Sequence, residues 1–467
     1  MRVLCRRPSL AAAATVLLTC LPAGRQDLSS GVQVTAADVA SLLLVAIAAA
    51  VALASRLPRP LPARASAPAH AVLPVRALAS GRAVPAAFAV VPARALVLAP
   101  VAAAAGLAML ASPDVLASLP GYVRCLQVFV LVPLAVLVTV RDRADTLIVG
   151  GALVGAAALQ GLVGCVQAVT GTGASYAGER VRAVGTFGAL DVMGMASVVS
   201  YGTLILLAAG LSWRGGRRAA ALGGAALLCV PLALSLSRGA WLALLGASLV
   251  VLFVHSRALA ARVILLGAAA AAVLALGPGA GSDPDLLGRR LSSITSAVSQ
   301  PDQSVSDRYS LWLTATRIWQ DHPLTGAGPR MFAELRDAYA PIELSSGSDT
   351  DDPVNGFQRR SLLSPHNMYL LTLSEQGLLG LAALGVCLGL MAWWAVRAAV
   401  PAAAGLLAWQ GIDFLYGDVG GPSTVVTSVV LGLVLSLVAR PSATGWAGEI
   451  PETGRAGGAS VALGGAR

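Results

Sequence analysis

The sequence contains no lysine, so all 33 basic residues are arginines, and charged residues make up only 12% of its 467 residues. Soluble domains usually carry about 25% charged residues. Aromatic residues are also scarce at 5%, yet 56% of the chain is hydrophobic, so small and aliphatic residues supply the apolar mass. This composition excludes a soluble enzyme, a disordered chain and a disulfide scaffold. It indicates a polytopic membrane protein.

Metal-ligand spacing is missing as well. The six cysteines (5, 20, 125, 165, 229 and 387) contain no CxxC pair, and the four histidines (70, 255, 322 and 366) are scattered. Most of the cysteines lie in or beside apolar runs, where a thiol usually acts as a small core residue. The sequence therefore predicts no metal site and no cofactor.

Apolar runs of roughly 16 to 24 residues recur along the chain, which is long enough for membrane-spanning helices rather than barrel strands. We predict an all-α polytopic fold with about twelve transmembrane helices. The expected spans are 9–23, 35–55, 90–111, 118–140, 145–169, 188–211, 219–236, 240–255, 262–277, 366–396, 398–416 and 423–439. Residues 1–24 fit either a cleaved signal peptide or a first span, and we favour the retained span.

Four arginine-rich connectors set the orientation: 56–89, 141–145, 214–218 and 256–261. Arginine in short loops stays on the inner side, so these connectors and both termini are expected in the cytoplasm, and the protein in the cytoplasmic membrane. Twenty arginines and four acids then lie inside, against thirteen arginines and nineteen acids outside. The net charge of +10 is therefore a topology signal, with membrane lipids rather than nucleic acid as partners.

This topology predicts four parts. Residues 1–277 form an N-terminal membrane domain with about nine spans and the cytoplasmic linker 56–89. Residues 278–365 form an extracytoplasmic loop with amphipathic helices, 366–440 the last spans, and 441–467 a cytoplasmic tail expected to be disordered. The 88-residue loop is by far the longest on the outer side. Long loops with helices of their own usually carry function.

Two arginines stand out at the outer ends of spans. Arg238, in Ser237-Arg238-Gly239, has apolar sequence on both sides. An arginine at the membrane boundary is costly and is a functional candidate; the alternative is an interfacial side chain reaching the headgroups. Arg182 lies in the next longest outer loop, shortly before a span. We favour a functional role for Arg238.

The stretch 307–319 has the pattern of an amphipathic helix. Its apolar face contains Leu311, Trp312, Ala315, Ile318 and Trp319, and for the two tryptophans we expect a helix resting on the membrane surface. Arg308 in the first turn of this predicted helix opposes the helix dipole, which suggests an anionic partner. His322 before a proline is expected to be structural.

His366 begins the predicted span 366–396, directly after the large loop. A helix N-terminus favours the neutral, base-competent form of histidine. Glu375 lies nine residues further on, about 13 Å deeper, and a buried carboxylate there needs a partner such as an arginine. Several arginines near the outer boundary suit a lipid-linked diphosphate, which they can bind bidentately and stabilise as a leaving group.

These segments together resemble the O-antigen ligase and polymerase family of polytopic membrane glycosyltransferases. The resemblance is carried, in family order over roughly residues 120–400, by the following motifs. They are Arg182 before Gly185-Thr186-Phe187, Ser237-Arg238-Gly239, Arg308-x-x-x-Trp312 leading into His322-Pro323-Leu324-Thr325-Gly326-Ala327-Gly328, and His366-Asn367 followed by Glu375-x-Gly377. Residues 341–365 match no part of the family pattern and are expected to shape the acceptor site.

The resemblance implies a fold similar to that of lipid-dependent glycosyltransferases. It implies transfer of a glycan from undecaprenyl diphosphate to a glycan or cell-wall acceptor on the outer face, without metal or cofactor. The family roles carried over make His366 and Arg238 catalytic, and give diphosphate binding to Arg182, Arg238 and Arg308. Asn367 and Glu375 would support the site. Whether the chain is a ligase or a polymerase stays open.

Two other functions compete with this interpretation. A polysaccharide transporter or flippase would explain twelve spans, but transporters tend to place polar residues at the middle of the membrane rather than at its outer boundary. A peptidoglycan-type polymerase would share the donor lipid but tends to rely on an acidic residue in its outer loop. The remaining possibility is a membrane protein whose arginines only mark its topology.

Overall fold

The computed structural model describes residues 7–22, 35–56, 92–176, 181–191, 193–276, 303–345, 347–352, 356–421 and 423–440. The predictions for the linker up to residue 89, for 278–302 and for the tail 441–467 concern residues outside these ranges.

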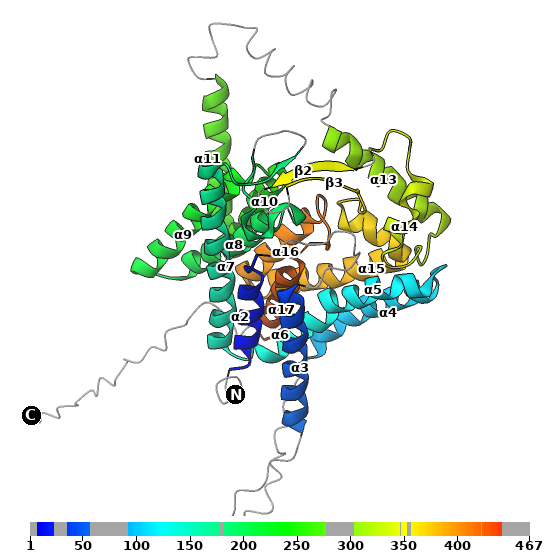
Figure 1. Cartoon of the computed structure of the whole chain (residues 1–467). Helices are drawn as coiled ribbons and strands as arrows, with labels where there is room; N and C mark the ends of the chain where they lie inside the picture. The colour runs from blue at the N-terminus through cyan, green and yellow to red at the C-terminus, as the bar shows by residue number, and fades with distance from the viewer. Residues whose placement is uncertain are drawn as a thin grey trace, which may run out of the picture.

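The described chain is almost entirely helical, with one small sheet (Figure 1). Its helices are α2 (Ser9–Leu18), α3 (Ala36–Arg56), α4 (Ala99–Leu110), α5 (Val115–Leu126), α6 (Val132–Thr139), α7 (Arg143–Thr170), α8 (Gly194–Ser212), α9 (Gly215–Leu234), α10 (Arg238–His255), α11 (Arg257–Leu276), α13 (Gln303–Asp321), α14 (Met331–Tyr339), α15 (Met368–Arg397), α16 (Pro401–Asp413) and α17 (Thr424–Ala439). Short 3-10 helices cover Ala93–Leu98 and Gly185–Leu190, and a π-helical turn, Gln127–Leu131, joins α5 to α6. The strands are β1 (Ser175–Tyr176), β2 (Ser348–Asp352) and β3 (Gly356–Arg360).

Eight helical stretches in the described residues are long and apolar enough to cross a membrane, and α2 and α17 are shorter apolar helices. The eight are Ala36–Ser55, Ala93–Leu110, Val115–Thr139, Arg143–Thr170, Gly194–Ser212, Gly215–Leu234, Arg238–His255 and Met368–Arg397. The all-α polytopic membrane fold is therefore confirmed, while the count of twelve spans stays a prediction. Several predicted boundaries were too generous, because α2 ends at Leu18 and α8 begins only at Gly194.

Two helices form the centre of the bundle. The side chains of α8 and α17 are buried along almost their whole length. Small residues allow neighbouring helices to approach closely: a Cβ on Gly202 of α8 would lie 2.4 Å from Ala157 of α7, and one on Gly432 of α17 would lie 2.6 Å from Val136. Such contacts are typical where lipid provides no hydrophobic drive between helices.

Helix α15 is broken inside its apolar run. Gly377 has φ 64° and ψ −164°, a conformation that L side chains rarely adopt. The backbone of the loop 323–328 pairs with residues 374–379 across this break, and we call the two segments together the α15 joint. Its hydrogen bonds run from Ala327 N to Ser374 O (2.9 Å), Gly328 N to Glu375 O (2.9 Å), Leu378 N to Pro323 O (3.0 Å) and Leu379 N to Leu324 O (3.1 Å). The loop thus satisfies backbone groups that the broken helix leaves open.

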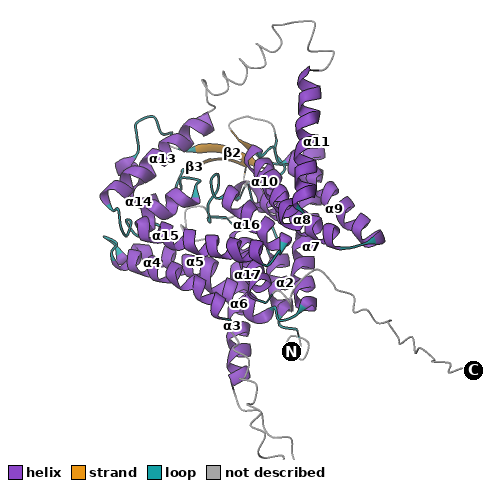
Figure 2. Ribbon diagram, turned by 180° about the vertical axis from the view of Figure 1, so that it is seen from behind, coloured by secondary structure: helices purple, strands orange, loops and turns teal. Residues whose placement is uncertain are grey.

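The helices α13 and α14 lie beside the N-terminal part of α15, and the hairpin of β2 and β3 extends from them toward α10 (Figures 1 and 2). The central strand β2 pairs antiparallel with β3 and with β1, where Ser175 is opposite Asp351. The sheet therefore ties the 170–187 loop to the large loop. Residues 341–365, which we expect from the sequence to shape an acceptor site, supply both strands of the hairpin.

Two predictions for α13 were wrong. Its apolar face packs on protein rather than resting on a membrane surface, because Leu311, Ala315 and Ile318 are buried in one cluster with Phe332 of α14. The helix also begins at Gln303, so Arg308 lies beyond its first turn. The dipole argument for an anionic partner of Arg308 therefore fails, and any such partner must be argued from the groups that surround the side chain.

Candidate functional site

His366 lies just before α15 with a strained backbone. Its φ is 49°, in the left-handed region that costs an L-residue about 1–2 kcal/mol. The backbone N–H of His366 donates to Ser364 Oγ at 3.1 Å. The side chain is 44% exposed although protein atoms surround much of the ring, so the imidazole faces an opening at the protein surface.

The two residues after His366 are fastened to the α16–α17 connection. Asn367 caps α15, because its Oδ1 accepts from Leu370 N at 3.0 Å, and its Nδ2 donates to Leu415 O at 3.2 Å. The N–H of Met368 donates to Phe414 O at 2.9 Å and Gly417 O at 3.0 Å. Asn367 therefore caps the start of α15 and holds the loop that contains Leu415.

Asp418 is the group that faces His366 from this loop. Its Oδ2 lies 4.0 Å from His366 Nδ1, and its side chain is 11% exposed. It also accepts a hydrogen bond from Ser364 Oγ. The imidazole therefore lies just before the start of α15, and the carboxylate that it faces lies after the end of α16.

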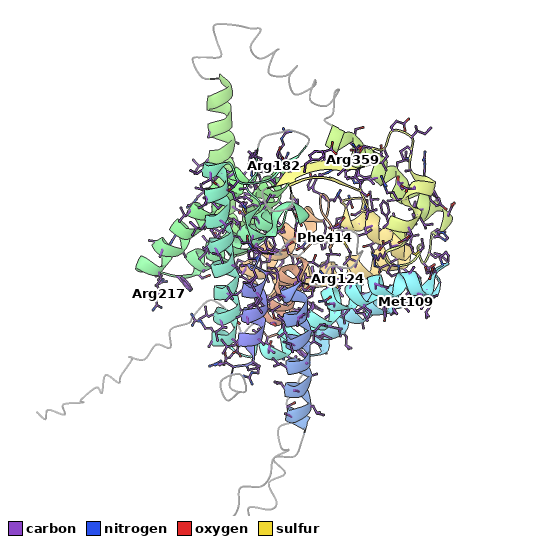
Figure 3. The ribbon with its side chains drawn as sticks, in the orientation of Figure 1. Met109, Arg124, Arg182, Arg217, Arg359 and Phe414 are labelled. Atoms are coloured by element: carbon purple, nitrogen blue, oxygen red, sulfur yellow. The ribbon has the colours of Figure 1, made fainter. Side chains whose placement is uncertain are left out.

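The arginines Arg308 and Arg182 complete the cluster. Arg308, on α13, interacts electrostatically with Arg182, Asp418 and His366. Arg182 is held by strand-like backbone pairing with Ala174, at 2.8 and 3.0 Å. Figure 3 shows Arg182 at the sheet, with Phe414 lying toward the middle of the molecule below it. Three of the predicted site residues, Arg182, Arg308 and His366, therefore lie in one electrostatic cluster.

Arg238 lies at the edge of this cluster. It is exposed at the first residue of α10, and Ser237 caps the helix by accepting from Ala240 N at 3.3 Å. A Cβ on the next residue, Gly239, would lie 3.2 Å from the ring of Tyr416. Tyr416 in turn contributes to the electrostatic surroundings of Arg308. The start of α10 is thus close to the loop that bears Asp418.

Glu375 has backbone partners that the sequence did not predict, besides a nearby arginine, Arg330. Its Oε1 accepts from the backbone N–H of Phe332 at 3.3 Å, and the backbone N–H of Arg330 also donates to the carboxylate. Glu375 therefore binds the N-terminus of α14, where the helix dipole favours a negative charge. Its role in the fold is to hold α14 against the α15 joint, with backbone N–H groups as partners in addition to the arginine that the sequence suggested.

Charge and burial set the proton affinities of the cluster. Burial lowers the pKa of His366; the Asp418 carboxylate opposes this shift, and the Arg308 cation adds to it. Burial raises the pKa of Asp418, against the effects of His366 and Arg308. Burial and the neighbouring Arg182 lower the pKa of Arg308. A neutral histidine at neutral pH is thus favoured, in the form that can accept a proton.

Arg182 and Arg308 lie within electrostatic reach of each other, and an anion bound near both reduces the repulsion between like charges. The Arg182–Arg308 pair is therefore suited to a polyanionic group, which guanidinium ions bind bidentately. A base next to such a group can deprotonate a hydroxyl that attacks an atom bonded to the anion. Among the described residues, no group of three or more His, Cys, Asp or Glu side chains could hold a metal ion.

The sequence reasoning missed Asp418. The segment Asp413-Phe-Leu-Tyr-Gly-Asp418 places two acids between two apolar runs, at the end of α16 and in the connection to α17. The rule that drew attention to Arg238, that a charge at this depth is costly and needs a reason, applies to these acids as well. A third buried acid, Asp191, accepts from Ser423 N at 2.9 Å and so holds the start of α17.

The comparison with known families gives one match. Residues 223–385 match the family model described as O-antigen ligase. This stretch contains Arg238, Arg308, His366 and Glu375, whereas Arg182 and Asp418 lie outside it. No curated protein matches the chain.

Proposed function

We propose that this chain, which belongs to the O-antigen ligase family, transfers a glycan from undecaprenyl diphosphate to an acceptor hydroxyl on the outer face of the cytoplasmic membrane. The family supports a membrane glycosyl-transfer role in surface polysaccharide synthesis. The lipid diphosphate, the acceptor hydroxyl and the orientation of the termini toward the cytoplasm belong to the proposal.

The observation that carries the proposal is the pairing of His366 with Asp418, 4.0 Å apart, beside the like-charged Arg308 and Arg182. A histidine with a carboxylate behind it is the arrangement of a general base whose protonated form is stabilised. Two adjacent guanidinium groups suit a diphosphate. The two halves of a glycosyl transfer, base and leaving-group support, thus lie in one cluster.

In the proposed reaction His366 takes the proton of the acceptor hydroxyl as its oxygen attacks the anomeric carbon of the donor. The new C–O bond forms while the bond from that carbon to the diphosphate oxygen breaks, and the electron pair leaves with the diphosphate. Arg308 and Arg182 neutralise the charge that develops on this leaving group. The attack takes place opposite the leaving group, so the anomeric configuration inverts.

Asp418 stabilises the imidazolium that forms when His366 accepts the proton. Arg238, exposed at the start of α10, is proposed to bind the part of the diphosphate nearer the membrane surface. Asn367 and Glu375 support the site through the structure that they hold, the cap of α15 and the start of α14. The proposed reaction needs no metal and no cofactor.

The proposal can be tested by measuring glycan release from undecaprenyl diphosphate in membranes that contain the protein. We expect His366→Ala and Arg308→Ala each to lower release by about a hundredfold or more, to a small residual rate, while the amount of folded protein stays normal. His255→Ala is the matched control, because His255 is exposed at the far end of α10. Release at the wild-type rate in His366→Ala would refute the base role.

Release that is unchanged in both site variants would exclude the enzyme and favour a transporter of the same lipid-linked glycan. The product pattern separates the two remaining reactions. A ladder of lengthening chains identifies a polymerase, whereas a single addition to each acceptor identifies a ligase.

A further inference from the structure

The backbone of His366 is held in its left-handed conformation from two sides. On the C-terminal side, Asn367 and Met368 are fastened to the 414–417 loop. On the N-terminal side stands Pro365, which has no N–H to donate. The backbone of Pro365 can therefore form hydrogen bonds only through its carbonyl oxygen. The indole Nε1 of Trp312 donates to this oxygen at 3.0 Å.

Trp312 lies one helical turn from Arg308 on α13. Residues four apart on a helix share a face, so the same face of α13 carries the cation beside the site and the anchor of the histidine loop. The face next to it, with Leu311 and Ala315 fully buried, fixes α13 against α14 and α15. The indole thus has little freedom to shift relative to the arginine.

We propose that Trp312 is a positioning residue for transfer: its indole N–H holds the Pro365 carbonyl and so sets the place of His366 relative to Arg308. The inference rests on the proposed function, because it concerns the geometry between the base and the leaving-group site. It adds a residue that acts through the backbone carbonyl of Pro365.

The chain offers a matched control on the same helix. Trp319, two turns further along α13, donates its indole Nε1 to another proline carbonyl, Pro323 O, at 3.1 Å. That carbonyl also accepts from Leu378 N at 3.0 Å, so it keeps a partner when the indole is removed. Both tryptophans therefore make the same kind of bond, but only Trp312 makes it beside His366.

The test compares Trp312→Phe with Trp319→Phe, each of which removes the N–H donor and keeps an aromatic ring. Rates of glycan release are normalised to folded protein, measured by size-exclusion chromatography of a fluorescent fusion. We expect kcat to fall about tenfold in Trp312→Phe, because small displacements of a catalytic group are costly. The KM for the lipid-linked donor should change less than about twofold, since the arginines stay in place. Trp319→Phe should match the wild type in both constants.

A second measurement separates positioning from a general loss of structure. In a His366→Ala background there is no base to position, so adding Trp312→Phe should leave the residual rate unchanged. A further fall in that double variant, or equal kcat for the two tryptophan variants, would overturn the inference. Wild-type protein without any release activity would instead refute the proposed function, so the two failures are distinguishable.

Discussion

Replacing Asp418 by Asn tests the role of the carboxylate behind His366 with almost no change in shape. Two unit charges 4 Å apart interact by about 4 kcal/mol at an effective dielectric constant of about 20. His366 Nδ1 and Asp418 Oδ2 are 4.0 Å apart, but the imidazole is 44% exposed, so solvent screening reduces the interaction to about half. About 2 kcal/mol of support for the imidazolium corresponds to a rate about thirtyfold lower in Asp418→Asn.

The pH dependence gives a second signature. Transfer needs neutral His366, so the rate falls as pH drops through the pKa of that histidine. The Asp418 carboxylate raises this pKa, in opposition to burial. Removing the carboxylate lowers the pKa further, and the acid limb of kcat/KM should therefore move to lower pH in Asp418→Asn.

The assay is glycan release from undecaprenyl diphosphate over a range of pH, with rates normalised to folded protein. The control is Asp337→Asn, because the Asp337 side chain on α14 is 87% exposed. An acid limb that stays in place, together with a rate within about threefold of the wild type, would show that Asp418 does not act on His366.

Three further outcomes are expected. Gly377→Ala should destabilise the protein by at least about 3 kcal/mol, because φ at this position is +64° and a Cβ would lie 2.3 Å from the backbone of Leu324. Thermal unfolding of a fluorescent fusion measures the effect. The control is Gly385→Ala on the same helix, which should be neutral because a Cβ there would meet nothing within 4 Å. Arg308→Lys should raise the KM for the donor about tenfold through loss of the bidentate fork, whereas Arg317→Lys, whose guanidinium donates to Tyr339 O on an exposed surface, should not change it. Arg124→Gln should lower stability by about 2 kcal/mol, because the Asp38 carboxylate loses its cation and keeps only neutral hydrogen-bond donors such as Thr35. Adding Asp38→Asn should recover part of this loss in the same unfolding measurement.

The class of fold was predictable because lipid imposes simple rules on a chain. Long apolar runs must form helices there, so the eight long apolar helices follow from hydropathy alone. Helix ends were less predictable. The predicted span 366–396 hides the break at Gly377, since hydropathy averages over a turn and does not report φ.

The residues of the candidate site that belong to local sequence motifs could be predicted, whereas partners from distant segments of the chain could not. Arg182, Arg308 and His366 were recognisable from their position and from the family pattern. Asp418 was not, because its pairing with His366 depends on how the α16–α17 connection lies over the start of α15. The partners of Glu375 were hidden for the same reason: backbone N–H groups, which every residue has, leave no mark in a sequence.

The α15 joint also implies an order of assembly during synthesis. A newly inserted span satisfies its own backbone in lipid only as an unbroken helix. The break at Gly377 leaves Ser374 O and Leu378 N without partners inside α15. Ala327 N and Pro323 O supply these partners only once the 323–328 loop has come within hydrogen-bonding distance. We therefore expect the span to enter the bilayer straight and to bend when the 323–328 loop docks on it. Because Asn367 and His366 lie at the N-terminal end of that same helix, we expect the candidate site to take its final form last, after the membrane bundle has formed.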